Sequence, residues 1–113
     1  LIKNELVTKP AIKPKSYAFC SDTTYNEDIV PIIKNVDVLY HESTFLEKHE
    51  NLAEPTKHST AKQAANIAKL ANVGTLLLGH YSTRYEGLNA FKEEAQEIFE
   101  NVELCEDGKV FEF

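Results

Sequence analysis

The sequence contains no methionine and no tryptophan, only two cysteines, and four glycines among its 113 residues. No window approaches the ~20 consecutive apolar residues of a membrane-spanning helix, and the first residues lack the charged and apolar regions of a signal peptide. We therefore expect a protein of the cytoplasm that does not enter a membrane. The chain opens on Leu1 and has no methionine to initiate translation, which predicts a fragment of a longer protein.

The two cysteines, Cys20 and Cys105, have no C-x-x-C spacing and lie in stretches predicted as buried strands. Such a pair favours two unreactive thiols in a reducing compartment. A single disulfide between them is the alternative.

The chain has few basic residues relative to acidic ones. Twelve lysines and arginines against eighteen aspartates and glutamates give a formal net charge of −6. A protein that grips a phosphate backbone by itself usually presents a basic face. The charge argues against independent RNA binding, although the chain can still supply catalytic groups while another segment holds the RNA.

The spacing of apolar residues predicts strands that alternate with helices, which is the pattern of an α/β fold. Residues 1–15, with Pro10 and Pro14, are predicted as an extended lead-in, and residues 16–113 as the folded part of the chain. Strands are predicted at 16–20, 36–40, 74–79 and 102–105, helices at 28–35, 47–51, 61–71 and 88–99, and a last strand at 110–113 that forms a hairpin around Asp107-Gly108. The predicted order is β-α-β-α-α-β-α-β-β.

Three of these strands end in residues that bind metal ions or move protons. Asp22, Glu42 and His80 each follow a predicted strand, and His58 comes just before the helix that Thr60 caps. In α/β layers, ligands gather beyond the carboxyl ends of the strands. Aspartate and histidine are good zinc ligands, so we expect these side chains to converge on one site. The chain has four histidines and no H-x-H pair, so a two-metal site needs further ligands from elsewhere.

The polar segments at these positions, taken in order, resemble the last motifs of the ribonuclease Z family. The likeness runs from about residue 17 to 113. It rests on Ser21-Asp22-Thr23, His41-Glu42-Ser43-Thr44-Phe45, Lys57-His58-Ser59-Thr60-Ala61 and Gly79-His80-Tyr81-Ser82-Thr83-Arg84-Tyr85. The resemblance implies the C-terminal half of a metallo-β-lactamase αββα sandwich, and a zinc-dependent endoribonuclease that removes the 3′ trailer of precursor tRNA.

The resemblance also implies a role for each matched residue. Asp22 would be the carboxylate that bridges two zinc ions, and His80 a terminal ligand of one of them. His58 would donate the proton to the leaving oxygen, and Glu42 would orient it; an imidazolium beside a carboxylate is a usable acid near neutral pH.

Two residues of the last motif carry a prediction from chemistry alone. Ser82 and Arg84 follow His80 closely in the same loop. Hydroxyl and guanidinium groups bind phosphate oxygens, the guanidinium with two donors at once. We therefore expect both side chains to contact the substrate phosphate.

Parts that the family places earlier in its chain are absent here: the H-x-H-x-D-H motif, a further metal-binding histidine and the arm that grips tRNA. We therefore expect this chain to be inactive unless it combines with the missing N-terminal half. The family implies a homodimer for the complete protein.

Each of these residues also has a purely structural interpretation. Asp22 could only cap a loop, His80 could be a structural histidine, and Glu42 and His58 could form a structural pair. We assign His41 and His49 to structure, His49 on a solvated helix face. Tyr81 and Tyr85 either stack on bases or belong to the core, and the core is favoured.

Two other functional classes fit parts of the pattern. A different hydrolase of the same fold, acting on a lactone, a thioester or a cyclic nucleotide, would be active without tRNA. A non-enzymatic α/β module would show no metal dependence, and substitution of Asp22 would then have no consequence.

Overall fold

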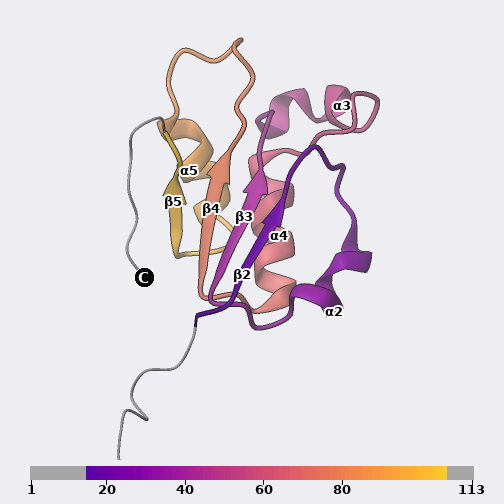
Figure 1. The fold of residues 1–113 in the computed structure, drawn as a ribbon. Coiled ribbons are helices and arrows are strands. Elements are labelled where there is room, and N and C mark those ends of the chain that lie inside the picture. The colour runs from indigo at the N-terminus through magenta and orange to yellow at the C-terminus, as the bar shows by residue number, and fades with distance from the viewer. Residues whose placement is uncertain (1–14, 107–113) are drawn as a thin grey trace, which may run out of the picture.

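A computed structural model describes residues 15–106 of the chain. Its centre is a parallel sheet in the order β2-β3-β4-β5, so neighbours in sequence are neighbours in space. The strands are β2 (Tyr17–Cys20), β3 (Val38–Glu42), β4 (Thr75–Gly79) and β5 (Val102–Leu104). Because every pair is parallel, all four carboxyl ends lie at one edge of the sheet (Figure 1).

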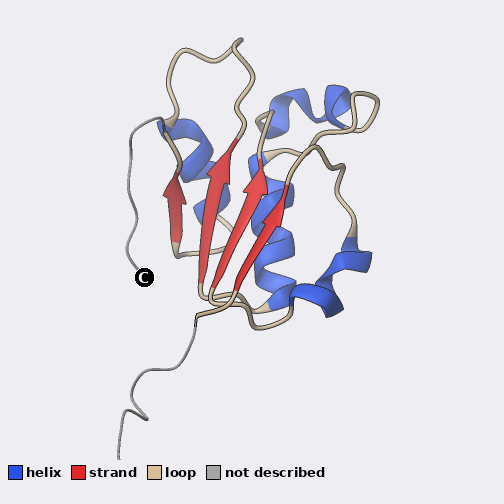
Figure 2. Ribbon diagram, viewed as in Figure 1, coloured by secondary structure: helices blue, strands red, loops and turns tan. Residues whose placement is uncertain are grey.

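The helices lie on one face of this sheet (Figure 2). They are α2 (Val30–Ile33), α3 (Glu50–Ala53), α4 (Ala61–Ala71) and α5 (Asn89–Gln96), and 3-10 turns, η2 (Glu27–Ile29) and η3 (Glu47–His49), precede α2 and α3. The order β-α-β-α-α-β-α-β confirms the predicted α/β class up to residue 106. The predicted lead-in at 1–15, apart from Lys15, and the hairpin at 107–113 fall outside the described residues.

Helix α4 has the bounds that the sequence predicts, because signals at both of its ends are local. Thr60 accepts a hydrogen bond from the Gln63 N–H and Gln63 bonds the Thr60 N–H in return, which forms a capping box. At the other end Asn72 adopts a left-handed conformation, which terminates the helix. The alanine-rich face of α4 packs against the sheet, and its contacts bury Leu39, Leu76 and others completely.

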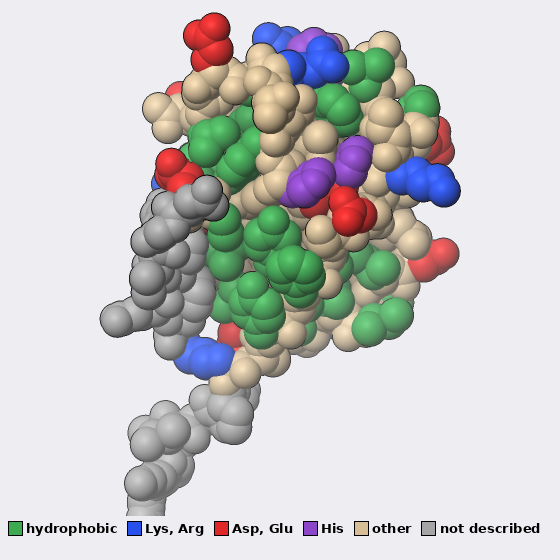
Figure 3. Space-filling model, turned by 45° about the horizontal axis from the view of Figure 1, so that its top comes forward, with side chains coloured by type: hydrophobic (Ala, Val, Ile, Leu, Met, Phe, Trp, Pro, Cys, Tyr) green, Lys and Arg blue, Asp and Glu red, His purple; other side chains and the backbone are tan. Residues whose placement is uncertain are grey.

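The opposite face of the sheet carries exposed aromatic side chains. Tyr17 is 57% exposed and Phe19 64% exposed, and the Phe19 ring stacks on Tyr40 with centroids 4.5 Å apart. Figure 3 shows the hydrophobic side chains gathered on this side. The prediction of a buried strand at 16–20 is therefore wrong: β2 is an edge strand, and alternate side chains point to a face that no described residue covers.

Several predicted boundaries are displaced by a few residues. Asn26, and not Asp28, accepts the capping hydrogen bond at the start of the first helical segment. Strand β3 continues past Tyr40 to Glu42, so Glu42 is the last residue of the strand instead of following it. The reason is tertiary, because β3 pairs with β4 as far as Glu42 and Gly79.

Cys20 and Cys105 form no disulfide with each other. Cys20 ends β2 and Cys105 follows β5, at opposite edges of the sheet. Both side chains are half-buried, so the predicted full burial is wrong. Burial still raises the pKa of the Cys20 thiol, which agrees with an unreactive group. Among residues 15–106, no helix has the length and apolar character to cross a membrane.

Candidate metal and proton-transfer site

Four side chains from separate segments converge at the carboxyl edge of the sheet. Asp22 follows β2, Glu42 ends β3, His80 follows β4, and His58 lies two residues before α4. One ligand atom from each lies within 4.8 Å of the other three. Figure 3 shows histidine and carboxylate side chains side by side above the hydrophobic patch. The structure thus brings together all four residues that the sequence singles out.

The backbone at Asp22 and His80 turns sharply as it leaves the strands. Both residues adopt positive φ angles, 51° at Asp22 and 60° at His80. This left-handed conformation is uncommon outside glycine, although aspartate and histidine are enriched in it, and it often marks functional sites. The turns bring the two side chains toward each other from strands separated by β3.

Glu42 is the most enclosed member of the group. Its side chain is fully buried. One carboxylate oxygen accepts hydrogen bonds from the Thr23 N–H and from His58, and the other accepts from the N–H groups of Ser59 and Thr44 and from the Thr44 hydroxyl. Three of the five donors are backbone N–H groups, which can only donate. The carboxylate is therefore ionised, and its oxygens are occupied.

Two opposing effects act on the pKa of Glu42. Burial by itself raises it, because desolvation disfavours the charged form. The hydrogen bonds from Ser59, His58 and Thr44, with the charge of His58, outweigh burial and hold the pKa below its usual range. The group is thus a permanent anion at neutral pH.

His58 is positioned by this anion. Its Nδ1 lies 2.6 Å from the nearer Glu42 oxygen, so Nδ1 carries a proton and Nε2 is left to face outward. The ring stacks on His80 with centroids 5.1 Å apart, and the Phe45 ring lies edge-on at 6.4 Å. With 22% of its side chain exposed, the imidazole is fixed in orientation yet reachable by a substrate.

Asp22 and His80 form a more open pair. The nearer Asp22 oxygen lies 3.7 Å from the His80 Nε2, and their side chains are 74% and 45% exposed. This separation is too long for a good hydrogen bond, but two ligands of one tetrahedral zinc ion stand about 3.4 Å apart when each bond is about 2.1 Å. The donor types and the gap fit a zinc ion. Two ligands do not complete a site, so further ligands must come from elsewhere.

Three residues of this site were not singled out from the sequence. The main chain of Thr23 and Ser59 and the side chain of Thr44 supply donors to Glu42. All three lie in the motifs that resemble ribonuclease Z, and this position is the only feature of the sequence that could have pointed to them. Their roles depend on contacts across 2 to 19 residues of sequence, which no local pattern reveals.

The remaining histidines of the described part make structural contacts. His41 is fully buried, its Nδ1 bonds the Glu42 carbonyl oxygen, and its Nε2 meets no partner among residues 15–106. His49 is half-buried, and its Nδ1 lies 2.6 Å from the Tyr85 hydroxyl. These contacts favour the structural interpretation of both residues, but His49 is half-buried and does not lie on a fully solvated helix face.

Tyr81 and Tyr85 are half-buried and pack against the core. Both rings pack against Phe91, with centroids 4.9 and 5.0 Å from it. The Tyr81 hydroxyl donates to the carbonyl oxygens of Leu78 and Cys105, and the Tyr85 hydroxyl accepts from the Leu46 N–H. These contacts favour the core interpretation over base stacking.

Ser82 and Arg84 lie in the loop after His80. The Ser82 Oγ accepts a hydrogen bond from the Arg84 N–H, 3.3 Å away. The exposed guanidinium of Arg84 stands 5.7 Å from the centre of the Phe45 ring, the ring that also lies beside His58. Arg84 is therefore on the same side of the site as His58 and remains available to an anion.

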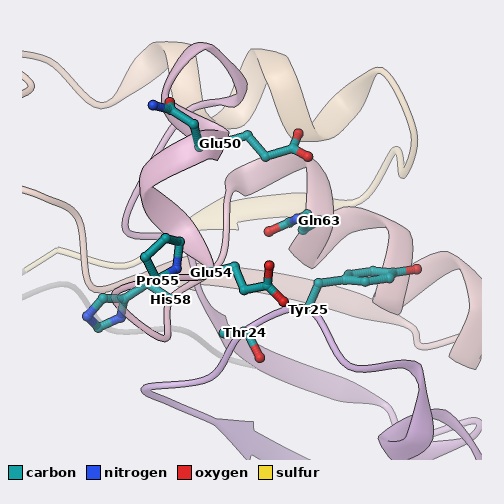
Figure 4. A pocket seen from close by; sticks show the side chains of 8 residues that line it. Thr24, Tyr25, Glu50, Glu54, Pro55, His58 and Gln63 are labelled. Atoms are coloured by element: carbon teal, nitrogen blue, oxygen red, sulfur yellow. The ribbon is translucent and has the colours of Figure 1, made fainter.

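A pocket of about 560 Å³ adjoins the site and shares only His58 with the group of four. It is lined by Thr24, Tyr25, Glu50, Asn51, Glu54, Pro55, His58 and Gln63. Figure 4 shows the His58 ring directed away from the other lining side chains, among which carboxylates are prominent. Glu50 and Glu54 make this pocket acidic, and Asp22, Glu42 and His80 do not line it.

Comparison with known proteins gives a consistent match. The chain is 51% identical to the ribonuclease Z of Parabacteroides distasonis over 108 residues and 50% identical to that of Cytophaga hutchinsonii over 105 residues, which covers 96% and 93% of the chain. The chain is a relative of ribonuclease Z. It spans only 36% and 34% of the length of these two ribonuclease Z relatives, so the match is to a part of the protein. No family model matches the chain.

Solved structures agree on the fold. The metallo-β-lactamase fold protein YhfI of Bacillus subtilis matches 82% of the chain with a TM-score of 0.76 and 26% identity. The short form of human tRNase Z matches 74% of the chain with a TM-score of 0.58 and 31% identity. The chain covers 38% and 27% of those two proteins. The expected fold class, part of a metallo-β-lactamase fold, is confirmed.

Proposed function

We propose that this chain supplies the later metal ligands and the proton-donor pair of a zinc-dependent endoribonuclease that removes the 3′ trailer of precursor tRNA. The observation that carries the proposal is the convergence of Asp22, Glu42, His58 and His80 within 4.8 Å in a chain half identical to ribonuclease Z sequences. Each of the four residues lies in a motif that resembles that family.

Asp22 and His80 would hold the metal. When two zinc ions are bound in the complete site, they supply Lewis-acid activation of a water nucleophile and neutralise charge on the phosphodiester. The exposed position of both side chains leaves room for the ligands that the missing N-terminal half would add. Asp22, whose carboxylate has two oxygens, would be the ligand shared between the ions.

His58 and Glu42 would act together to protonate the leaving group. The Glu42 carboxylate, 2.6 Å from the His58 Nδ1, stabilises the charged imidazolium and directs Nε2 toward the substrate. His58 then donates the Nε2 proton to the departing 3′ oxygen, which is a poor leaving group without protonation. Glu42 is a positioning residue here, since its oxygens are occupied by other donors.

Ser82 and Arg84 would bind the phosphate that is cut. The exposed Arg84 guanidinium and the His58 ring both lie beside the Phe45 ring, which supports a role for Arg84 at the same phosphodiester. The formal charge of −6 leaves the grip on the tRNA body to other parts of the protein. We therefore propose that the chain is inactive alone and acts together with the N-terminal half of the protein. The complete protein would be a homodimer in the cytoplasm.

The experiment is cleavage of a precursor tRNA with a 3′ trailer by the intact protein that contains this chain, with and without chelator. Asp22→Asn is the test variant and Asp28→Asn, an exposed aspartate outside the site, its control. Metal-dependent cleavage at the trailer junction that Asp22→Asn abolishes and Asp28→Asn retains supports the proposal. Cleavage that survives Asp22→Asn removes Asp22 from the site, and absence of cleavage by the unmodified protein points to another hydrolase of this fold.

A further inference from the structure

The Thr44 side chain connects the two halves of the site. Its hydroxyl oxygen lies 2.8 Å from the second Glu42 oxygen and 2.8 Å from the His80 Nδ1. A continuous chain of hydrogen bonds thus runs from His58 through Glu42 and Thr44 to His80. Thr44 is 6% exposed, so water does not readily replace either contact.

The single proton of the hydroxyl fixes the direction of this chain. The Glu42 carboxylate receives three backbone N–H groups and is acceptor-only, so Thr44 must donate its proton to it. The Thr44 oxygen is then an acceptor toward His80. Were the proton directed to His80 instead, two oxygen atoms with lone pairs would face each other at 2.8 Å inside the protein, which is strongly unfavourable.

The backbone holds this arrangement in place. The Ser82 N–H donates to the Thr44 carbonyl oxygen at 2.9 Å, and the Ser43 N–H donates to that of Gly79 at 2.8 Å. The segment after β3 and the loop after β4 are thereby clamped together around Thr44. These backbone hydrogen bonds hold the segments that carry Thr44 and His80 next to each other.

We propose that Thr44 is a positioning residue that fixes the tautomer of His80, with the proton on Nδ1 and the lone pair of Nε2 directed at Asp22. The consequence follows from the 3.7 Å gap between Nε2 and the Asp22 oxygen. With Nε2 unprotonated, two acceptors face one another across that gap, and a cation between them relieves the repulsion. The inference rests on the proposed zinc site, but it concerns protons that exist in the metal-free protein.

The test is the position of the ring proton of His80, read by long-range proton–nitrogen NMR on the intact, metal-free, nitrogen-15-labelled protein at about pH 8.5, where an ordinary imidazole is neutral. His80→Gln assigns the signals. We expect Nδ1 to carry the proton in the unmodified protein. In Thr44→Val, which replaces the hydroxyl by a methyl group, the proton shifts to Nε2 and the affinity for zinc alone falls about 10- to 100-fold.

Two further variants separate this role from a general effect on the fold. Thr44→Ser keeps the hydroxyl and should keep both the tautomer and the zinc affinity, and Thr83→Val, at an exposed threonine of the same loop, should do the same. A proton on Nε2 in the unmodified protein overturns the inference even if Thr44→Val does not fold, and so does a Thr44→Val protein that retains the Nδ1 proton. RNA cleavage is not measured, so failure here leaves the proposed function standing.

Discussion

The two halves of the site are built in opposite ways. Glu42 and His58 form a closed pair, in which a fully buried carboxylate receives five hydrogen bonds and holds an imidazole at 2.6 Å. Asp22 and His80 form an open pair, mostly exposed and 3.7 Å apart. The first half is complete within this chain, whereas the second is arranged to receive a ligand. The two pairs thus differ in burial and in spacing, and the Thr44 hydroxyl is the side chain that contacts both of them.

The largest effect should follow from damage to the closed half. Glu42→Gln replaces an acceptor oxygen by an NH₂ group that faces buried donors, so we expect the free energy of unfolding to fall by about 3 kcal/mol. Urea unfolding followed by circular dichroism measures the change. Glu54→Gln, at an exposed carboxylate of the neighbouring pocket, should change it by less than about 0.5 kcal/mol. If both variants lose the same free energy of unfolding, the buried Glu42 carboxylate contributes no more to stability than an exposed one, and the prediction is wrong.

Substitution in the open pair should lower the affinity for zinc and leave the free energy of unfolding nearly unchanged. Asp22→Asn removes the charge but keeps a residue that tolerates the positive φ of this position. We expect zinc affinity to fall at least about 100-fold, measured by competition with a chromogenic chelator, while unfolding of the metal-free protein changes by less than about 0.5 kcal/mol. A large loss of stability would mean that Asp22 is a structural loop residue.

Acid should lower the free energy of unfolding through His41, a fully buried histidine whose Nδ1 bonds the Glu42 carbonyl oxygen. Burial, the largest cause, lowers the pKa of His41 from its ordinary value of 6.5. As the pH falls below 6.5, His41 therefore binds a proton in the unfolded chain but not in the folded one. The free energy of unfolding is unaffected by His41 above pH 6.5 and decreases below it, by up to about 1.4 kcal/mol per pH unit.

Urea unfolding at several pH values between 7.5 and about 5 measures that slope. His41→Gln should remove this contribution, because glutamine does not titrate. His49→Gln, at a half-buried histidine bonded to Tyr85, should leave the slope in place. An unchanged slope in the His41 variant would assign the acid sensitivity to other groups.

The smallest effect concerns the helix that follows His58. Thr60 caps α4 and is buried, so Thr60→Ala should lower the free energy of unfolding by about 1 kcal/mol. Thr60→Ser retains the capping oxygen and should lose less. Thermal unfolding compares the three proteins. If serine and alanine behave alike, packing of the threonine methyl group and not the cap stabilises this end of α4.

Local patterns in the sequence predict most of the elements. Helix α4 matches its predicted bounds because Thr60, Gln63 and Asn72 act within one or two turns of the helix ends. The burial of β2 is predicted wrongly, since Tyr17 and Phe19 look like core residues in isolation. What covers a strand depends on the rest of the fold, and side chains that alternate between two faces carry no information about which face is covered.

The sequence by itself determined the chemical inventory of the site: an aspartate, a glutamate and two histidines, each next to the end of a strand or the start of a helix. Only the tertiary structure decided how they are used. The donors to Glu42 come from three segments, and Thr44 meets His80 across 36 residues of chain. The physical reason is that a strand or a helix cap forms from neighbouring residues, whereas the ionisation of a buried carboxylate and the tautomer of a histidine are fixed by groups that only the folded chain brings together.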